Sequence, residues 1–310
     1  MIDQPDPHPD MRPLIEARDA MPPAKTVAEQ RANWTRMSEA LRAPYPEDMM
    51  VTMDAAPRPD GAVPLRVYKP AGANGSAILY FHGGGFMKGD LDSGDTVAWG
   101  YAQETGAVVF SVDYRLTPEH AFPAAFDDCY AALEYVAGKA LDYGIDPGRI
   151  AVAGDSAGGN LAAAVSLAAR DRNGPQIAAQ VLVYPMLGLN LALGTAVTAA
   201  DAPGLTKKAL SEYWLLYLNG AEVTDNPYAA PLVGADFAAL PPAFIHTAEL
   251  DPLCDDGVVY ADRLKAAGTP VTYRCAERMI HGFTRIRHTG PAVKHEFDLL
   301  CGFLKEHLDP

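Results

Sequence analysis

The sequence predicts an α/β fold, in which a mostly parallel sheet is covered by helices on both faces. From residue 77 onward, short apolar segments alternate with helix-like segments, an order typical of buried parallel strands. Glycines such as Gly106 and Gly138 follow the helix-like segments, where helix C-termini favour a left-handed residue. One interval, residues 185–242, is too long for a crossover of one short loop and one helix, which predicts an insertion there.

The individual elements follow from the local pattern of apolar residues. The expected strands are residues 49–54, 63–68, 77–81, 107–112, 150–153, 179–184, 243–248 and 271–275. The expected helices are residues 27–41, 93–105, 124–137, 160–170, 207–218, 257–267 and 291–308. Residues 57–61 are rich in Pro and Gly, so the first two strands are expected to form a hairpin. Residues 1–47 are expected to form one or two helices outside the main sheet.

The chain is acidic, with a formal net charge of −14 over 310 residues and a pI near 4.9. Nucleic acid and anionic membranes would be repelled by such a surface, so neither is expected as a partner. Residues 1–13 carry Asp and Pro in place of a basic patch followed by an apolar run, so no secretory signal is expected. The longest apolar runs are far shorter than the roughly 20 residues of a membrane span. These features together predict a cytoplasmic protein.

The four cysteines do not follow a metal-binding pattern. Cys129, Cys254, Cys275 and Cys301 are widely spaced, without a C-x-x-C motif or a histidine cluster beside them. Free thiols are therefore expected in preference to disulfides or structural zinc. Neither a metal nor an organic cofactor is expected.

Residues 152–160 contain a G-x-S-x-G motif between a predicted strand and a predicted helix. Its central residue is Ser156, flanked by Gly154 and Gly158. A serine hydroxyl is a weak nucleophile, and a tight strand-to-helix turn with small neighbours can present it to a base. The helix that starts near Ala157 points free N–H groups toward the same place. Ser156 is therefore the candidate nucleophile, although a motif this short also occurs by chance.

A second motif, His82-Gly83-Gly84-Gly85, follows the strand at residues 77–81. Successive glycines allow backbone N–H groups to point at a developing oxyanion without obstruction by side chains. A phosphate-binding loop is the alternative, but it needs a G-x-x-x-x-G-K-[ST] spacing that is absent. The expected oxyanion donors are the N–H groups of Gly84, Gly85 and Ala157. His82 is expected to fix the loop.

A nucleophilic serine needs a base and an acid that orients the base, in the chain order Ser, Asp or Glu, His. Glu249 and Asp251 follow the strand at residues 243–248, at the sheet edge where ligands approach. Asp251 is preferred because Pro252 should make its turn rigid, and Glu249 is the alternative. His281 lies in the loop after the strand at residues 271–275 and is the candidate base.

Bulky side chains outside the predicted sheet are candidates for contact with a substrate. The candidate substrate-binding residues are Trp34, Met37, Phe86, Tyr213, Trp214 and Tyr217. Three of the aromatic residues form a stripe on the predicted helix of the insertion, which core packing alone would also explain. A lid above Ser156 would serve both purposes.

These motifs closely resemble those of the bacterial hormone-sensitive-lipase-like carboxylesterases of the α/β-hydrolase superfamily. The matching segments are His82-Gly83-Gly84-Gly85, residues 113–120 (D-Y-R-L-T-P-E-H), residues 154–160 (G-D-S-A-G-G-N), Asp251-Pro252-Leu253 with Asp255-Asp256, and His281-Gly282-Phe283. The resemblance covers the chain from about residue 50 to the end. It implies an eight-stranded sheet whose second strand is antiparallel. It also implies a helical cap, built from residues 1–47 and an insertion at about residues 187–230, over a catalytic domain of residues 48–310.

The same resemblance implies hydrolysis of short to medium acyl esters, with Ser156, Asp251 and His281 as the catalytic triad. A small-molecule ester is then the expected partner. The alternatives are a non-catalytic small-molecule binding protein on the same fold, and a hydrolase of amides or lactones. The strand at residues 271–275 is a candidate edge strand, which could pair with a second copy in a homodimer.

Overall fold

The computed structural model describes residues 5–188, 191–192, 194–234 and 236–309. Within them, eight strands form one sheet in the order β1-β2-β4-β3-β5-β6-β7-β8. The strands are β1 (Met49–Arg58), β2 (Gly61–Pro70), β3 (Ala77–Phe81), β4 (Val108–Val112), β5 (Ile150–Asp155), β6 (Ala179–Val183), β7 (Ala243–Leu250) and β8 (Val271–Ile280). Strand β2 is antiparallel to both of its neighbours, and the remaining pairs are parallel. The prediction of a mostly parallel, eight-stranded sheet is confirmed.

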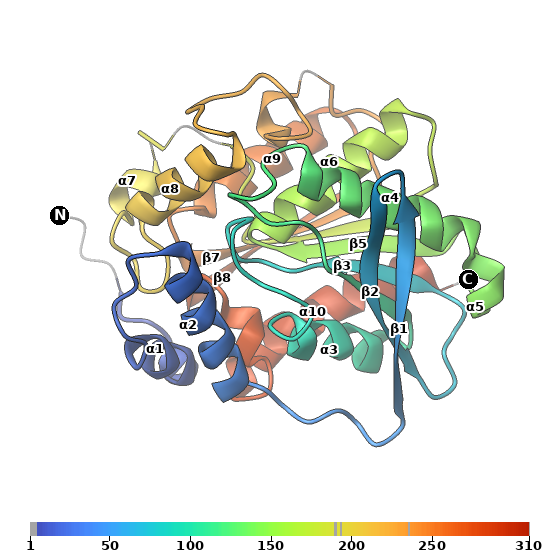
Figure 1. Ribbon diagram of the computed structural model, residues 1–310, viewed down its shortest axis with the longest axis horizontal. Coiled ribbons are helices and arrows are strands. Elements are labelled where there is room, and N and C mark those ends of the chain that lie inside the picture. The colour runs from blue at the N-terminus through green and yellow to red at the C-terminus, as the bar shows by residue number, and fades with distance from the viewer. Residues whose placement is uncertain (1–4, 189–190, 193, 235, 310) are drawn as a thin grey trace.

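Helices cover both faces of the sheet (Figure 1). The α-helices are α1 (Arg12–Asp19), α2 (Val27–Ala40), α3 (Asp95–Thr105), α4 (Ala124–Gly138), α5 (Ala140–Tyr143), α6 (Ala157–Asp171), α7 (Thr195–Thr198), α8 (Lys207–Tyr217), α9 (Cys254–Ala266) and α10 (Pro291–Leu308). Short 3-10 helices are η1 (Pro9–Met11), η2 (Pro231–Val233) and η3 (Phe283–Ile286). Helices α4, α6 and α9 pack on one face of the sheet, and α3 and α10 pack on the other.

The central strands are buried along their whole length, which explains their continuous apolar sequences. Every residue of β3, β4, β5 and β6 is buried. Glycine ends α3 and α5, where Gly106 and Gly144 adopt φ values of 74° and 75°. These ends return the chain to the sheet after a few residues. Gly138 does not follow its helix as expected, because it is the last residue of α4 and Lys139 caps that helix.

The outer strands are longer than the sequence predicts. Strand β8 continues to Ile280, well beyond the expected end at residue 275, and many of its residues are half-buried or exposed. Strands β1 and β2 extend through the expected turn to Arg58 and Gly61. Polar residues are tolerated in outer strands because backbone pairing continues where the side chains face water. An apolar run therefore underestimates the length of these strands.

Two segments far apart in the sequence meet beyond the carboxyl ends of the parallel strands. Helix α2, near the N-terminus, and helix α8, in the long connection between β6 and β7, lie at the same end of the molecule (Figure 1). Residues of α1, α2 and α8 line one common hollow there. These helices cover the strand ends where the predicted motifs lie.

Candidate active site

Ser156 occupies a tight turn between β5 and α6. Its backbone has φ 57° and ψ −117°, an unusual conformation for a residue other than glycine. A Cβ on Gly154 would overlap the carbonyl of Gly158, and a Cβ on Gly158 would overlap the carbonyl of Phe81. Only glycine at both positions lets the strand, the turn and the neighbouring strand approach this closely. The motif therefore holds the Ser156 side chain at the end of the sheet.

Ser156, His281 and Asp251 form one chain of hydrogen bonds. The Ser156 Oγ lies 2.9 Å from His281 Nε2, and His281 Nδ1 lies 2.6 Å from Asp251 Oδ2. Asp251 is fully buried, and its Oδ1 accepts a second hydrogen bond from the Leu253 backbone N–H. An acceptor carboxylate at Nδ1 places the imidazole proton there, which leaves Nε2 free to accept the serine proton.

Glu249, the alternative acid, faces away from this chain. Its side chain is exposed, and its Oε2 accepts a hydrogen bond of 2.7 Å from the Arg278 backbone N–H. The strand pairing of β7 with β8 is irregular between Ala248 and Leu250, which turns Glu249 outward. Asp251 is thus the carboxylate that reaches His281.

Three backbone N–H groups near Ser156 lack acceptors. Among the described residues, the N–H groups of Gly84, Gly85 and Ala157 have no hydrogen-bond partner. Gly84 and Gly85 adopt φ values of 143° and 62°, conformations that favour glycine. Both line the hollow that contains Ser156 and His281. Such an arrangement of free donors can stabilise an oxyanion.

Asp155 fixes the glycine loop against the strand that carries Ser156. Its Oδ1 accepts hydrogen bonds from the Tyr80 hydroxyl at 2.6 Å and the Gly83 N–H at 2.9 Å. His82 is buried, and its ring stacks on Tyr114 with 4.4 Å between ring centroids. Burial lowers the pKa of His82. His82 therefore packs beneath the loop as a neutral side chain.

The sequence and the fold of this chain have counterparts among known proteins. Residues 78–285 match a family model that describes the alpha/beta hydrolase fold. The chain belongs to this family. Its matches include Carboxylesterase NlhH of Mycobacterium tuberculosis, at 44% identity over 236 residues, which are 74% of each protein. Esterase LipI of the same species is 39% identical over 286 residues, which are 90% of this chain and 89% of LipI.

A solved structure extends the match of this hydrolase to nearly the whole chain. A thermostable esterase from Pseudomonas putida ECU1011 has a TM-score of 0.92 at 30% identity, covering 99% of both chains. The resemblance to the hormone-sensitive-lipase-like carboxylesterases, first drawn from the motifs, is confirmed by these relatives.

The hollow at Ser156 of the hydrolase is narrow, with a volume of about 40 Å³. Its lining residues are Arg18, Trp34, Gly84, Gly85, Lys88, Asp155, Ser156, Gly204, Leu205, Tyr213, His281, Gly282 and Arg285. A wider hollow of about 410 Å³ shares Arg18, Trp34, Lys88 and Gly204 with it. The wider hollow therefore adjoins the narrow one beneath α1, α2 and the start of α8.

Three of the candidate substrate-binding residues lie in or beside the Ser156 hollow. Trp34 from α2 and Tyr213 from α8 line it directly. The Tyr213 ring covers Gly85, because a Cβ on this glycine would lie 2.5 Å from the ring. Met37 is buried and lines only the wider hollow.

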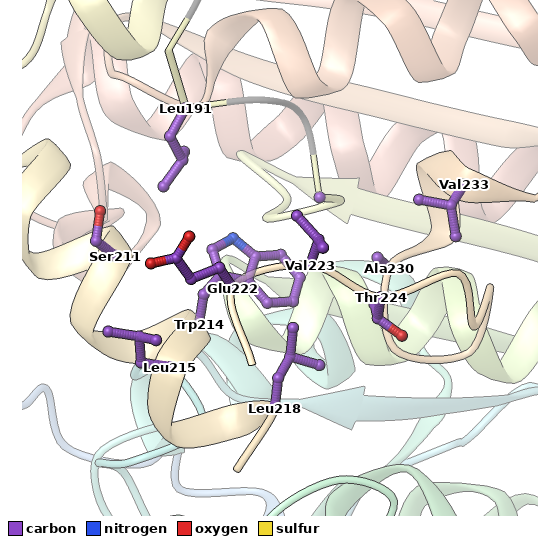
Figure 2. A pocket seen from close by; sticks show the side chains of 11 residues that line it. Leu191, Ser211, Trp214, Leu215, Leu218, Glu222, Val223, Thr224, Ala230 and Val233 are labelled. Atoms are coloured by element: carbon purple, nitrogen blue, oxygen red, sulfur yellow. The ribbon is translucent and has the colours of Figure 1, made fainter. Parts of the chain in front are cut away.

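The other three candidates do not line the Ser156 hollow. Phe86 and Tyr217 are fully buried and stack on each other, with ring centroids 3.7 Å apart. Tyr217 is a core residue because its side of α8 packs inward, and Phe86, from the loop after β3, packs against it. Trp214 lines a separate cavity of about 500 Å³. Figure 2 shows this cavity, with Trp214 beside Leu218 and Glu222. That cavity shares no lining residue with the Ser156 hollow.

Four charged residues that line the Ser156 hollow are not identified from the sequence: Arg18, Lys88, Arg285 and Asp155. Arg18 donates from Nη2 to the His281 carbonyl oxygen at 2.8 Å. Arg285 lies over the Trp34 ring at 4.3 Å and forms an ion pair of 3.6 Å with Asp155. Arginines on helices usually face water, and nothing in the local sequence marks these two. Asp155 could have been recognised, because it directly precedes Ser156.

The described residues contain no group of three His, Cys, Asp or Glu side chains able to hold a metal ion. All four cysteines are free thiols, as expected, although Cys275 is only half-buried and its Sγ lies 4.0 Å from that of Cys254. In the part of the hydrolase that the structure describes, no helix combines the length and apolarity needed to cross a membrane.

Proposed function

We propose that this protein is a carboxylesterase that hydrolyses short to medium acyl esters through Ser156, His281 and Asp251. The observation that carries the proposal is the hydrogen-bonded chain from Ser156 Oγ through His281 to Asp251, at 2.9 Å and 2.6 Å, beside three free N–H donors. The names of the relatives, carboxylesterase and esterase, support the same reaction. A non-catalytic binding protein would have no need of this arrangement.

The reaction divides into two steps that use the same groups. His281 Nε2 accepts the hydroxyl proton of Ser156 as Oγ bonds to the carbonyl carbon of the ester. The N–H groups of Gly84, Gly85 and Ala157 bind the resulting oxyanion, and His281 gives the proton to the departing alcohol. Water then loses a proton to His281 as its oxygen bonds to the acyl carbon. The bond from this carbon to Ser156 Oγ breaks, His281 returns the proton to Oγ, and the carboxylic acid is released. Asp251 stabilises the imidazolium in both steps.

The helical cap limits the length of the acyl group that fits at Ser156. Residues 1–47 and about 187–230 act as the cap, whose Trp34 and Tyr213 line a hollow of only about 40 Å³ at Ser156. Each buried methylene adds about 0.8 kcal/mol of binding free energy until the space is filled. The rate should therefore peak at about two to eight acyl carbons and then fall.

A series of p-nitrophenyl esters from acetate to palmitate, together with emulsified triolein, tests this proposal. We expect kcat/KM to peak within the short esters and triolein to be hydrolysed poorly. Faster cleavage of palmitate than butyrate, or a sharp rise of activity at the lipid interface, would replace the capped esterase with a lipase. Absence of turnover on every ester would contradict the proposed function itself.

A further inference from the structure

The hollow at Ser156 is cationic in a protein that is otherwise strongly acidic. Its charged lining residues, His281 apart, are Arg18, Lys88, Arg285 and Asp155, so three cations face one carboxylate. The chain as a whole carries a formal net charge of −14. Asp155 is already engaged by Arg285, Tyr80 and the Gly83 N–H. Two cations, Arg18 and Lys88, are therefore left without a carboxylate that neutralises them.

Arg18 is held in the site with part of its hydrogen-bonding capacity unused. Its Nη2 donates to the His281 carbonyl oxygen, but its Nη1 is buried and has no partner. The guanidinium lies between two glycines, because a Cβ on Gly204 would overlap Nη1 and a Cβ on Gly282 would lie 2.7 Å from Nη2. A buried donor without a partner is costly, so a ligand acceptor at this position would stabilise the site.

Lys88 extends the same positive region toward the wider hollow. Its Nζ donates to the Tyr213 hydroxyl at 2.7 Å and lies 4.8 Å from the centroid of the Trp34 ring. The ammonium forms no ion pair with a carboxylate in the described part of the chain. Both Arg18 and Lys88 line the narrow and the wider hollow, so they flank the passage between them.

Other arginines of the chain form ion pairs with carboxylates, unlike Arg18. Arg31 binds Glu119, and Arg58 binds Asp128. Arg18 has a long-range electrostatic attraction to Asp251. Burial and the neighbouring Arg285 nevertheless lower the pKa of Arg18 to about 10. An anion beside Arg18 would offset both the burial and the repulsion.

We propose that Arg18 and Lys88 form a carboxylate-binding subsite, so that the preferred substrates are esters carrying a free carboxylate a few bonds from the scissile carbonyl. This inference rests on the proposed function, since the subsite adjoins the Ser156 and His281 side chains. Guanidinium and ammonium groups bind carboxylates through charge-assisted hydrogen bonds, which are stronger than neutral ones. The carboxylate belongs either to the acyl part, as in a monoester of a dicarboxylic acid, or to the alcohol part, as in an acylated hydroxy acid.

Two matched pairs of esters test the subsite and distinguish these sources. Monomethyl glutarate and its primary-amide analogue differ only in a carboxylate or an amide on the acyl part. O-acetyl-lactate and O-acetyl-lactamide differ in the same way on the alcohol part. In at least one pair, we expect kcat/KM for the carboxylate to exceed that for the amide by about tenfold.

Variants identify the residues responsible for this ratio. Arg18→Gln should lower the ratio of carboxylate to amide kcat/KM about fivefold or more, and Lys88→Gln should lower it as well. Arg18→Lys should retain part of the preference because it keeps the charge. Arg12→Gln is the matched control: it removes one charge from the same helix at an exposed position and should leave the ratio unchanged. Thermal melting of each variant shows whether the fold is kept.

A ratio of one or below in both pairs, with the amides still hydrolysed, would overturn the subsite and leave the esterase standing. A ratio that Arg18→Gln, Arg18→Lys and Lys88→Gln all leave unchanged would also overturn it. If no ester in either pair is hydrolysed, calorimetry on Ser156→Ala decides the question. Tighter binding of monomethyl glutarate than of its amide, lost with Arg18→Gln, would support the subsite, whereas equal binding would contradict it.

Discussion

At the scale of single residues, Asp251 and Glu249 have opposite surroundings although they are two positions apart. Asp251 is fully buried and bonds to His281 Nδ1, whereas Glu249 is exposed and bonds to the Arg278 backbone. The proposed mechanism assigns a role to Asp251 alone. Its carboxylate fixes the imidazole tautomer and stabilises the imidazolium that forms during the reaction.

Asp251→Asn should lower kcat on p-nitrophenyl butyrate by about 10³- to 10⁴-fold, because an amide no longer holds the proton on His281 Nδ1. Glu249→Gln is the matched control and should stay within about twofold of the native rate, since Gln can still accept from Arg278. Initial-rate kinetics on both purified variants measure the difference. Near-native kcat for Asp251→Asn would remove Asp251 from the mechanism.

At the scale of elements, helix α2 connects its own stability to the site. Thr26 and Glu29 form a reciprocal capping box: Thr26 Oγ1 accepts from the Glu29 N–H, and Glu29 Oε2 accepts from the Thr26 N–H. Two turns later, the same helix places Trp34 against the hollow at Ser156. The Thr26–Glu29 capping box thus fixes the start of a helix whose packing narrows the active site.

Thr26→Ala should lower the free energy of unfolding by about 1 kcal/mol, because the first turn of α2 loses its side-chain acceptor. Thr26→Ser retains the hydroxyl and should remain close to native. Urea denaturation followed by circular dichroism measures both. Equal destabilisation by Ala and Ser would show that the lost methyl group, not the hydrogen bond, is responsible.

The elements also show what the sequence could predict. Strands β3 to β6 can be predicted directly from their apolar runs because they are buried on both faces. For β8 the apolar run predicts too short a strand, because many of its residues are exposed or half-buried. The stripe on α8 identifies a helix face but not which of its residues line the Ser156 hollow: Tyr213 lines it, whereas Tyr217 is buried in the core. The Arg18 environment joins three distant segments, and no local pattern signals such a contact.

At the scale of the whole molecule, buried histidines connect the stability of the fold to pH. His246 on β7 is fully buried, and its Nε2 bonds to Glu296 on α10 at 2.9 Å. Burial lowers the pKa values of His246 and of His82 beneath the glycine loop from the usual 6.5. For Glu296, burial opposes ionisation, but hydrogen bonds from His246 and Arg274 lower its pKa to about 2, so it stays charged at mild acidity.

The free energy of unfolding should therefore fall as the pH drops below about 6.5, because the unfolded chain binds protons at these histidines that the folded chain does not. Urea denaturation at a series of pH values from 7.5 to 5 measures this slope, expressed per pH unit. His246→Gln should make the slope shallower whatever its effect on absolute stability. A native stability that is flat across this range would contradict the neutral, buried state of both histidines.

The most direct measurement of the proposed mechanism is covalent labelling with a p-nitrophenyl alkylphosphonate, followed by peptide mass spectrometry. Attack by Ser156 Oγ on phosphorus should release one equivalent of p-nitrophenolate and leave the phosphonyl group on Ser156, with loss of ester hydrolysis. Ser156→Ala should take up no label and should lose about 10⁴-fold or more in kcat on p-nitrophenyl butyrate, with its fold retained. A label on another residue, or near-native hydrolysis by Ser156→Ala, would contradict the assignment of Ser156 as the nucleophile.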